Sequence, residues 1–275
     1  MDTVITLTTD FGLKDAYVAA MKGVILGINR SARLVDICHT IEPQNILQAA
    51  FILSTAYRFF PEKTIHIVVV DPGVGSERKA IILKTPTAYF VAPDNGVLSY
   101  VIQEYSDKAT TDITHLQPTE LGRGLEAVSI TNSGYWRPLV SATFHGRDIF
   151  APVAAWLSLG TVPIEFGERI NSLTVLPLPH PYQQPDGSMV AHIIHIDGFG
   201  NLITDMKSNS LPGDKQSITI EVAGHHITGL SRTYSDGEGL LALIGSSGYL
   251  EISLKEGNAH HFLNARVGDE VRINY

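Results

Sequence analysis

The sequence predicts an α/β domain with a mostly parallel sheet flanked by helices, followed by a smaller all-β, barrel-like domain. Three observations support this fold class. Strand and helix patterns alternate over the first 160 residues, a proline-rich segment follows, and short strands separated by Gly, Ser and Asp make up the remainder. We therefore divide the chain into a catalytic α/β domain (1–172), a proline-rich linker (173–187) and a β-barrel-like domain (188–275).

The elements of the first domain alternate between strand and helix periodicity. Residues 3–9 alternate as a strand and lead into Asp10, and residues 14–28 carry apolar side chains at helical spacing. The expected elements then continue as a strand at 33–37, a helix at 45–59 ending before Pro61, a strand at 64–70, paired strands at 79–83 and 88–92, and a helix at 148–159 closed by Gly160. This β-α-β-α-β order predicts parallel pairing.

The composition changes near residue 173. Residues 173–187 contain four prolines, a density that predicts an irregular linker. Beyond the linker, strand patterns occur at 189–197, 217–224, 225–230, 240–245, 249–254 and 270–275. Six short strands with polar turns between them predict a barrel-like sheet.

Composition restricts the function classes. The formal net charge is -8 and 44% of residues are hydrophobic, so we expect a sizeable core and no nucleic-acid partner. The single cysteine, Cys38, cannot form an intrachain disulfide, which indicates a reducing compartment. Neither a signal peptide nor a span of about 20 apolar residues is evident, so we expect a cytoplasmic protein without membrane contact.

The segment from Ile65 to Arg78, IHIVVVDPGVGSER, is the most informative in the chain. A buried strand ends at Asp71, and a Pro-Gly-Val-Gly turn follows, which is how open α/β sheets place polar groups at a binding crevice. Asp10 likewise follows an apolar strand, so we expect both carboxylates at the crevice. Asn95, in the sequence PDNG, fits a turn better than a site.

Other polar motifs leave two interpretations open. His145 lies in the loop FHGRD, where a ligand could approach closely, and Asp148 fits a helix N-cap. In the second domain, Asp197–Asn201 could form a bulge, or together with Ser246–Tyr249 it could contact a heterocycle. Histidines at 192 and 195, 225 and 226, and 260 and 261 have spacings that make poor chelates, so a metal site has little support.

Six motifs together resemble one family. In chain order they are TTDFG, VVDPGVGSER, APDNG, FHGRD, IDGFGN and IGSSGYLEI, and they span nearly the whole chain. This set resembles the S-adenosylmethionine hydrolases (adenosine-forming), which are hydroxide adenosyltransferases related to fluorinase and chlorinase. The resemblance implies hydrolysis of S-adenosyl-L-methionine (SAM) to adenosine and L-methionine, with no cofactor and no metal. It also implies a homotrimer with sites between subunits.

The resemblance also implies roles for individual residues. A catalytic trio would consist of Asp71, Arg78 and His145, and Asp10 would hold the ribose diol. The remaining substrate-binding residues that we expect are Phe11, Asp15, Asn95, Phe144, Asp197, Phe199, Asn201, Ser246, Ser247, Tyr249, Glu251 and Leu254. Asp197 would meet the methionine amino group, and Ser247 stands where the fluorinase has an arginine near the methionine carboxylate.

These residue types suit attack of hydroxide on C5′ of SAM. The leaving group departs as a neutral thioether, so the chemical difficulty lies in forming the nucleophile from water. An arginine can stabilise an oxyanion, while a carboxylate and an imidazole can orient water and accept its proton. The resemblance implies that the halogenating relatives have other residues at these three positions. The presence of all three here favours water over halide as the nucleophile.

Three alternatives remain at this stage. A halide-dependent 5′-halo-5′-deoxyadenosine synthase is the nearest. A non-catalytic adenosine- or SAM-binding protein belongs to a different class. A metal-dependent hydrolase would use Asp71, His145 and Asp148.

Overall fold

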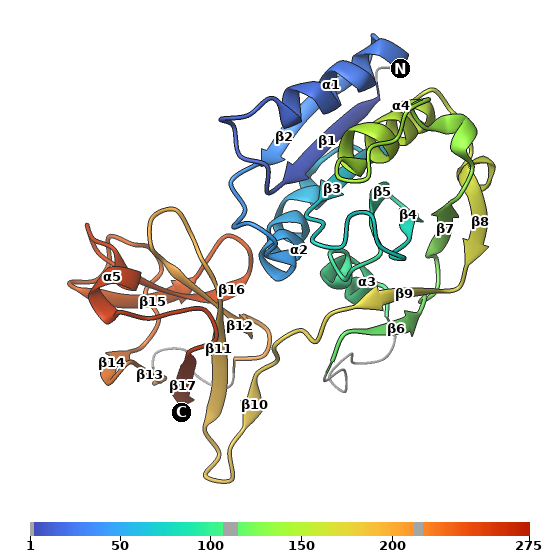
Figure 1. The fold of residues 1–275 in the computed structure, drawn as a ribbon. Coiled ribbons are helices and arrows are strands. Elements are labelled where there is room, and N and C mark those ends of the chain that lie inside the picture. Colours follow the sequence, from blue (N-terminus) through green and yellow to red (C-terminus); the bar gives the residue numbers. More distant parts are fainter. Residues whose placement is uncertain (1–2, 107–114, 212–216) are drawn as a thin grey trace. The chain divides into compact units, whose positions relative to one another are not determined.

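The computed structural model describes residues 3–106, 115–211 and 217–275, and it divides the chain into two compact units, Met1–Leu178 and Pro179–Tyr275 (Figure 1). Each unit has its own hydrophobic core. The two-domain architecture expected from the sequence is therefore present.

The first unit is built on a seven-stranded sheet with the order β2-β1-β3-β5-β4-β7-β8. Its strands are β1 Val4–Thr9, β2 Arg33–Cys38, β3 Thr64–Val69, β4 Ala80–Lys84, β5 Ala88–Pro93, β7 Glu126–Ile130 and β8 Gly167–Ile170. A separate pair is formed by β6 Gln117–Glu120 and β9 Ser172–Val175. The helices are α1 Tyr17–Ile28, α2 Ile46–Ala56, α3 Ser99–Glu104 and α4 Ala151–Ser158.

Helices cover both faces of the parallel half of this sheet (Figure 1). Ile65 and Ile67 of β3 pack in one core with α1 and α4, and Val68 packs in the other core with α2 and α3. The strand is buried on both faces, which explains its unbroken apolar run. His66 is also fully buried in β3, where its Nδ1 lies 2.8 Å from the Thr6 hydroxyl.

The expectation of a mostly parallel sheet is only partly correct. Pairs β2-β1, β1-β3 and β3-β5 are parallel, whereas β5-β4, β4-β7 and β7-β8 are antiparallel. The short connection between β4 and β5 accounts for the first antiparallel pair, because only a crossover of a dozen or more residues can return a chain to a parallel neighbour. The parallel half is the part that carries Asp10 and Asp71.

Two helix boundaries differ from the sequence expectation in informative ways. Asn45 is the N-cap of α2, and its side-chain oxygen accepts a hydrogen bond from the Gln48 amide. Asp148 is not an N-cap, since Gly146–Phe150 form a π-helical turn that leads into α4. Its carboxylate is buried against Arg147 and lies 3.5 Å from Arg137.

The second unit is an antiparallel sheet with the order β14-β13-β17-β11-β12-β16-β15, and β10 pairs with β11. Its elements are β10 Tyr182–Gln183, β11 Met189–Ile196, β12 Leu202–Lys207, β13 Thr219–Val222, β14 His225–Thr228, β15 Leu240–Ile244, β16 Tyr249–Leu254, α5 Ala259–Leu263 and β17 Glu270–Asn274. The end strands β14 and β15 approach each other, so the sheet is nearly closed into a barrel (Figure 1).

The proline-rich segment is more regular than expected. Its first residues, Leu173–Val175, continue β9 and pair with β6, while Tyr182 and Gln183 form β10. Prolines at 177, 179 and 181 occupy the stretch between these strands, where no ladder donor is needed. In the described part of the chain, every helix is too short or too polar to cross a lipid bilayer.

Candidate active site

A cavity of about 390 Å³ lies at the carboxyl edge of the parallel strands in the first unit. Thr9 of β1 pairs with Val69 of β3, so Asp10 and Asp71 follow their strands at the same sheet edge. Both carboxylates line the cavity. The other lining residues are Phe11, Tyr17, Gln44, Val69, Pro72, Val74, Thr143, Phe144, His145 and Gly146.

Asp71, Arg78 and His145 are in direct contact, although His145 is 67 residues from Arg78 in sequence. Arg78 Nε donates to both oxygens of Asp71, at 2.9 and 3.0 Å, and a terminal nitrogen of Arg78 also donates to this carboxylate. The same terminal nitrogen lies 2.9 Å from Nδ1 of His145. The guanidinium therefore joins the other two side chains, and it packs over the Phe150 ring.

This geometry fixes the tautomer of His145. A guanidinium has only donors, so Nδ1 must be the acceptor in its contact with Arg78. The imidazole is then neutral and carries its proton on Nε2. Burial, and next the positive charge of Arg78, lower the pKa of His145 below its ordinary value of 6.5, which favours the same neutral form.

The position of Arg78 differs from that of its two partners. Asp71 and His145 line the cavity, but Arg78 is not among the lining residues. Its side chain is 10% exposed and that of Asp71 is 5% exposed. Arg78 is thus placed to orient and charge-balance the two cavity-lining groups.

Asp10 is held with one carboxylate oxygen engaged. Its Oδ2 accepts a hydrogen bond of 2.8 Å from the backbone N–H of Gln44, a residue with a left-handed φ of 66°. Beside it, the rings of Phe11, Tyr17 and Phe144 pack edge-on or tilted, with centroids 5.2–5.8 Å apart. Together they form an aromatic wall next to a carboxylate, an arrangement suited to a nucleoside.

Two residues expected at the site do not line this cavity. Asp15 is exposed just before α1. Asn95 instead joins two loops, because its Nδ2 donates to the Val70 carbonyl and its Oδ1 accepts from the Val97 amide. By holding Val70, Asn95 fixes the residue that precedes Asp71, which agrees with the turn role favoured by its sequence.

Residues expected at the site from the second unit fall in two turns and in β16. Asp197 closes the β11–β12 turn by accepting from the amides of Phe199 and Asn201 and from the Asn201 side chain, all at 2.9 Å. Phe199 is 80% exposed at the tip of this turn. The sequence DGFGN is therefore a tight hairpin turn that presents an aromatic ring.

The second turn contains Ser246 and Ser247, both exposed, and leads to Tyr249 and Leu254 of β16. Glu251 is buried behind it, where it accepts from the hydroxyls of Tyr234 and Ser253. Burial, and then the carboxylates of Glu251 and Asp197, raise the pKa of Tyr234 to about 12. Tyr234 thus lies near both carboxylates, a position that no sequence motif indicates.

Sequence reasoning also missed several residues around the first cavity. Tyr17 and Thr143 lie within a few residues of the motifs TTDFG and FHGRD, so their proximity to a motif could have identified them. Gln44 carries no such signal. It reaches the cavity because its positive φ turns the chain after β2 toward Asp10.

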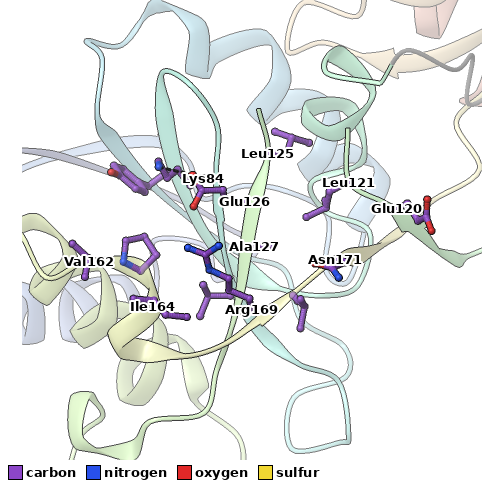
Figure 2. A pocket seen from close by; sticks show the side chains of 14 residues that line it. Lys84, Glu120, Leu121, Leu125, Glu126, Ala127, Val162, Ile164, Arg169 and Asn171 are labelled. Carbon is purple, nitrogen blue, oxygen red and sulfur yellow. Dashed lines mark hydrogen bonds and ion pairs between the residues drawn. The ribbon is translucent and has the colours of Figure 1, made fainter. Parts of the chain in front are cut away.

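A larger cavity of about 540 Å³ lies elsewhere in the first unit (Figure 2). Lys84 and Glu126 form an ion pair of 2.7 Å on its wall, and Val162 and Ile164 contribute exposed apolar side chains. None of the residues expected at the site lines it. We assign the functional site to the smaller cavity, because only that one contains interacting ionisable groups at the carboxyl ends of parallel strands.

Metal-ligand clusters are not found in the described ranges 3–106, 115–211 and 217–275, where no group of three or more His, Cys, Asp or Glu residues could hold an ion. The trio proposed for a metal-dependent hydrolase does not assemble as a ligand set. Asp148, its third member, is engaged with Arg147 and with the Ser141 amide.

Comparison with known proteins identifies relatives over the full chain. The family model described as the SAM hydroxide adenosyltransferase N-terminal domain matches residues 5–167, and the corresponding C-terminal domain model matches residues 191–272. A protein of Methanocaldococcus jannaschii named (R)-S-adenosyl-L-methionine hydrolase is 34% identical, over 99% of this chain and 96% of its own length. A protein of the same name from Salinispora arenicola is also 34% identical, over 98% and 97%.

A more distant relative and a solved structure also match this chain over nearly its whole length. The fluorinase of Nocardia brasiliensis is 24% identical over 98% of this chain and 96% of its own length. The crystal structure of an uncharacterised conserved protein from Thermotoga maritima superposes with a TM-score of 0.85 at 36% identity, covering 98% of this chain and 100% of that chain.

Proposed function

This chain belongs to the SAM hydroxide adenosyltransferase family, and from that premise we propose that it hydrolyses S-adenosyl-L-methionine to adenosine and L-methionine. Full-length identity of 33–34% to four curated SAM hydrolases is the observation that carries this function. The contact between Asp71, Arg78 and His145 beside a cavity supports it with a chemical mechanism.

In the proposed reaction the oxygen of a water molecule forms a bond to C5′ of SAM. The bond from C5′ to sulfur breaks, and its electron pair remains on sulfur, so that methionine leaves as a neutral thioether. The water proton passes to Asp71, because its carboxylate lines the cavity and Arg78 holds it beside His145. Combining an incipient hydroxide with a sulfonium removes charge, so a water-poor site favours the transition state.

The tautomer of His145 gives it a donor role in this mechanism. With Nδ1 occupied by Arg78, the proton on Nε2 is available to the oxygen of the attacking water. A hydrogen bond from Nε2 stabilises negative charge as it develops on that oxygen. Arg78 charge-balances the Asp71 carboxylate and holds His145 in the donating tautomer.

Substrate recognition is divided between the two units. In the first unit, Asp10 binds the ribose diol through its second oxygen, and Phe11 and Phe144 pack against the nucleoside. In the second unit, the turns that contain Phe199 and Ser246 supply the remaining contacts, with Asn201, Ser247, Tyr249, Glu251 and Leu254. Neither Asp15 nor Asn95 lines the cavity, and Asn95 instead donates to the Val70 carbonyl.

The configuration at sulfur is part of the proposal. The curated relatives are named for the (R) form of the sulfonium. We expect this chain to prefer the same epimer.

The assembly remains a prediction from the family resemblance. We propose a homotrimer in which the first unit of one chain and the second unit of another complete each site. Exposed Leu13 and Tyr17, next to the cavity-lining loop, are apolar surface that such an assembly would cover. The cytoplasmic location also remains a prediction.

The decisive experiment is incubation of the protein with each SAM epimer separately, followed by chromatography for adenosine and methionine. We expect both products in equal amounts from the (R) epimer, with or without a chelator. Adenosine binding without methionine release would show a binding protein instead. A halonucleoside formed on addition of chloride or fluoride would favour the synthase, to which the more distant relatives at 23–24% identity correspond.

A further inference from the structure

His39 is a buried histidine that no step of the proposed reaction uses. It follows β2 and is 4% exposed. Its Nδ1 lies 2.8 Å from the hydroxyl of Thr9, at the end of β1, and its Nε2 lies 3.0 Å from a carboxylate oxygen of Asp36. Asp36 in turn accepts a hydrogen bond of 2.6 Å from Lys22 on α1.

The chemistry of Asp36 determines which group donates and which accepts in the contacts from Asp36 through His39 to Thr9. The Asp36 carboxylate lies 3.0 Å from Nε2 without hydrogen-bond geometry, so it acts on the ring through its charge, which favours the His39 tautomer with the proton on Nε2. Nδ1 is then an acceptor, and the Thr9 hydroxyl donates its proton to it. The lone pairs of the Thr9 oxygen remain free to accept, and the backbone N–H of Phe11 donates to this oxygen at 3.2 Å.

A second contact from His39 reaches the same turn. The His39 carbonyl accepts a hydrogen bond of 2.7 Å from the N–H of Gly12, which has a left-handed φ of 68°. The amides of Phe11 and Gly12, the two residues after Asp10, are thus both held by the Thr9–His39 pair. Asp10 itself lines the cavity, whereas Thr9, Asp36 and His39 do not.

We propose that His39, acting through Thr9 and oriented by Asp36, is the positioning group that aims the Asp10 carboxylate at the ribose diol. The inference rests on the proposed function, in which Asp10 binds that diol. Asp10 Oδ2 is fixed by the Gln44 amide, and across the residues that the structure describes no group is bonded to Oδ1. The conformation of the Asp10–Gly12 turn therefore determines where Oδ1 of Asp10 points.

Discrimination between adenosine and 2′-deoxyadenosine tests this role, measured by calorimetric titration of the full-length protein with each nucleoside. The ratio of the two dissociation constants reports the diol contact, and partial loss of folded protein leaves it unchanged. Thr9→Val keeps the side-chain shape and removes the hydroxyl, so we expect the ratio to fall about tenfold, as for one lost hydrogen bond to a charged group. Thr9→Ser restores the hydroxyl and should recover the ratio.

Asp36→Asn provides a second variant, because this carboxylate is 39% exposed and its loss leaves the core intact. The ratio should fall by a smaller factor of about three, since only the preference of His39 for one tautomer is lost. Glu62→Gln, on an exposed carboxylate before β3, is the matched control and should leave the ratio unchanged.

The ribose contact of Asp10 and the positioning role of His39 fail in different ways. If the wild-type protein binds both nucleosides equally, Asp10 does not hold the diol, and the substrate-binding proposal falls together with this inference. If the wild-type protein discriminates and Thr9→Val and Asp36→Asn discriminate equally well, the positioning role of His39 is wrong while the proposed function stands.

Discussion

At the scale of single residues, the guanidinium of Arg78 is the centre of the proposed catalytic trio. It offers Nε and a terminal nitrogen in one plane, and it uses them on Asp71 and His145 together. A lysine has one compact ammonium group and cannot make this planar set of contacts. We therefore expect Arg78→Lys to lower kcat by about a hundredfold or more, with little change in KM, because the trio acts on the attacking water.

The measurement is the initial rate of adenosine release as a function of SAM concentration. Arg272→Lys is the matched control, since Arg272 forms only a long surface contact of 3.8 Å with Asp186 in the second unit. Equal kcat for Arg78→Lys and the wild type would contradict the role of Arg78.

The lowered pKa of His145 predicts a particular acid limb in the activity profile. A histidine whose pKa lies below 6.5 stays neutral to lower pH than a free histidine. Protonation of Nδ1 breaks its contact with Arg78, so activity is lost only as pH falls through this lowered value. We expect kcat to be nearly constant above pH 6.5 and to decline below it.

The pH profile of His145→Gln checks this assignment. The variant should be slower at every pH, and the part of the acid limb that belongs to His145 should disappear. An acid limb of the same midpoint in this variant would assign it to another group.

The convergence of these residues was predictable to different degrees. Asp10 and Asp71 could be placed together because both end apolar strands, and parallel strands share a carboxyl edge. The contact of His145 with Arg78 came only from the family resemblance, since no local pattern links residues 67 positions apart. Tyr234 and Gln44 were missed because loop geometry alone determines where they lie.

At the scale of elements, the loop after β3 and the segment before the π-helical turn support each other. Gly75 has φ of 80°, and a Cβ added there would lie 2.7 Å from the Ala142 carbonyl oxygen. Gly75→Ala should thus displace the segment that leads to Thr143 and His145. We expect kcat to fall by roughly ten- to a hundredfold, because small misplacements of reacting groups are costly.

Gly224→Ala separates this effect from backbone strain. Gly224 also has a left-handed φ, of 76°, but no atom lies within 4 Å of the added Cβ. Gly224→Ala should lose about 1 kcal/mol of unfolding free energy, and Gly75→Ala should lose more because the clash with Ala142 adds to the strain. Unfolding by denaturant and steady-state kinetics measure the two effects, and equal activity of the two variants would contradict the coupling of these loops.

Elements with a strong apolar pattern were predicted correctly. Strands whose place depends on the topology of the whole sheet were not. The buried strand β3 and the helices α1 and α2 were identified from apolar spacing. β12, with the sequence LITDMK, was missed because the buried polar residues Thr204 and Asp205 interrupt its apolar run. The antiparallel half of the first sheet was underestimated because β7 and β8 join it from distant parts of the chain.

At the scale of the whole molecule, the residues expected at the site are divided between two units with separate cores. The trio and Asp10 belong to the first unit, and Phe199, Asn201 and Glu251 belong to the second. A site built within one chain and a site built between chains make different predictions for mixed oligomers. Subunit complementation distinguishes them without any assumption about how the units are arranged.

The experiment mixes two variants that we expect to be inactive, Asp71→Ala in the first unit and Asn201→Ala in the second, after dissociation and reassembly at equal amounts. If each site of a cyclic trimer combines the first unit of one chain with the second unit of its neighbour, random assembly makes about one site in four fully wild type. We therefore expect about a quarter of wild-type activity to return, although each variant alone is inactive. Sites contained within single chains would restore nothing, because no chain in the mixture carries both intact units. A sedimentation measurement on the same mixture shows that reassembly has occurred, so that absence of activity in reassembled protein would overturn the inter-subunit site.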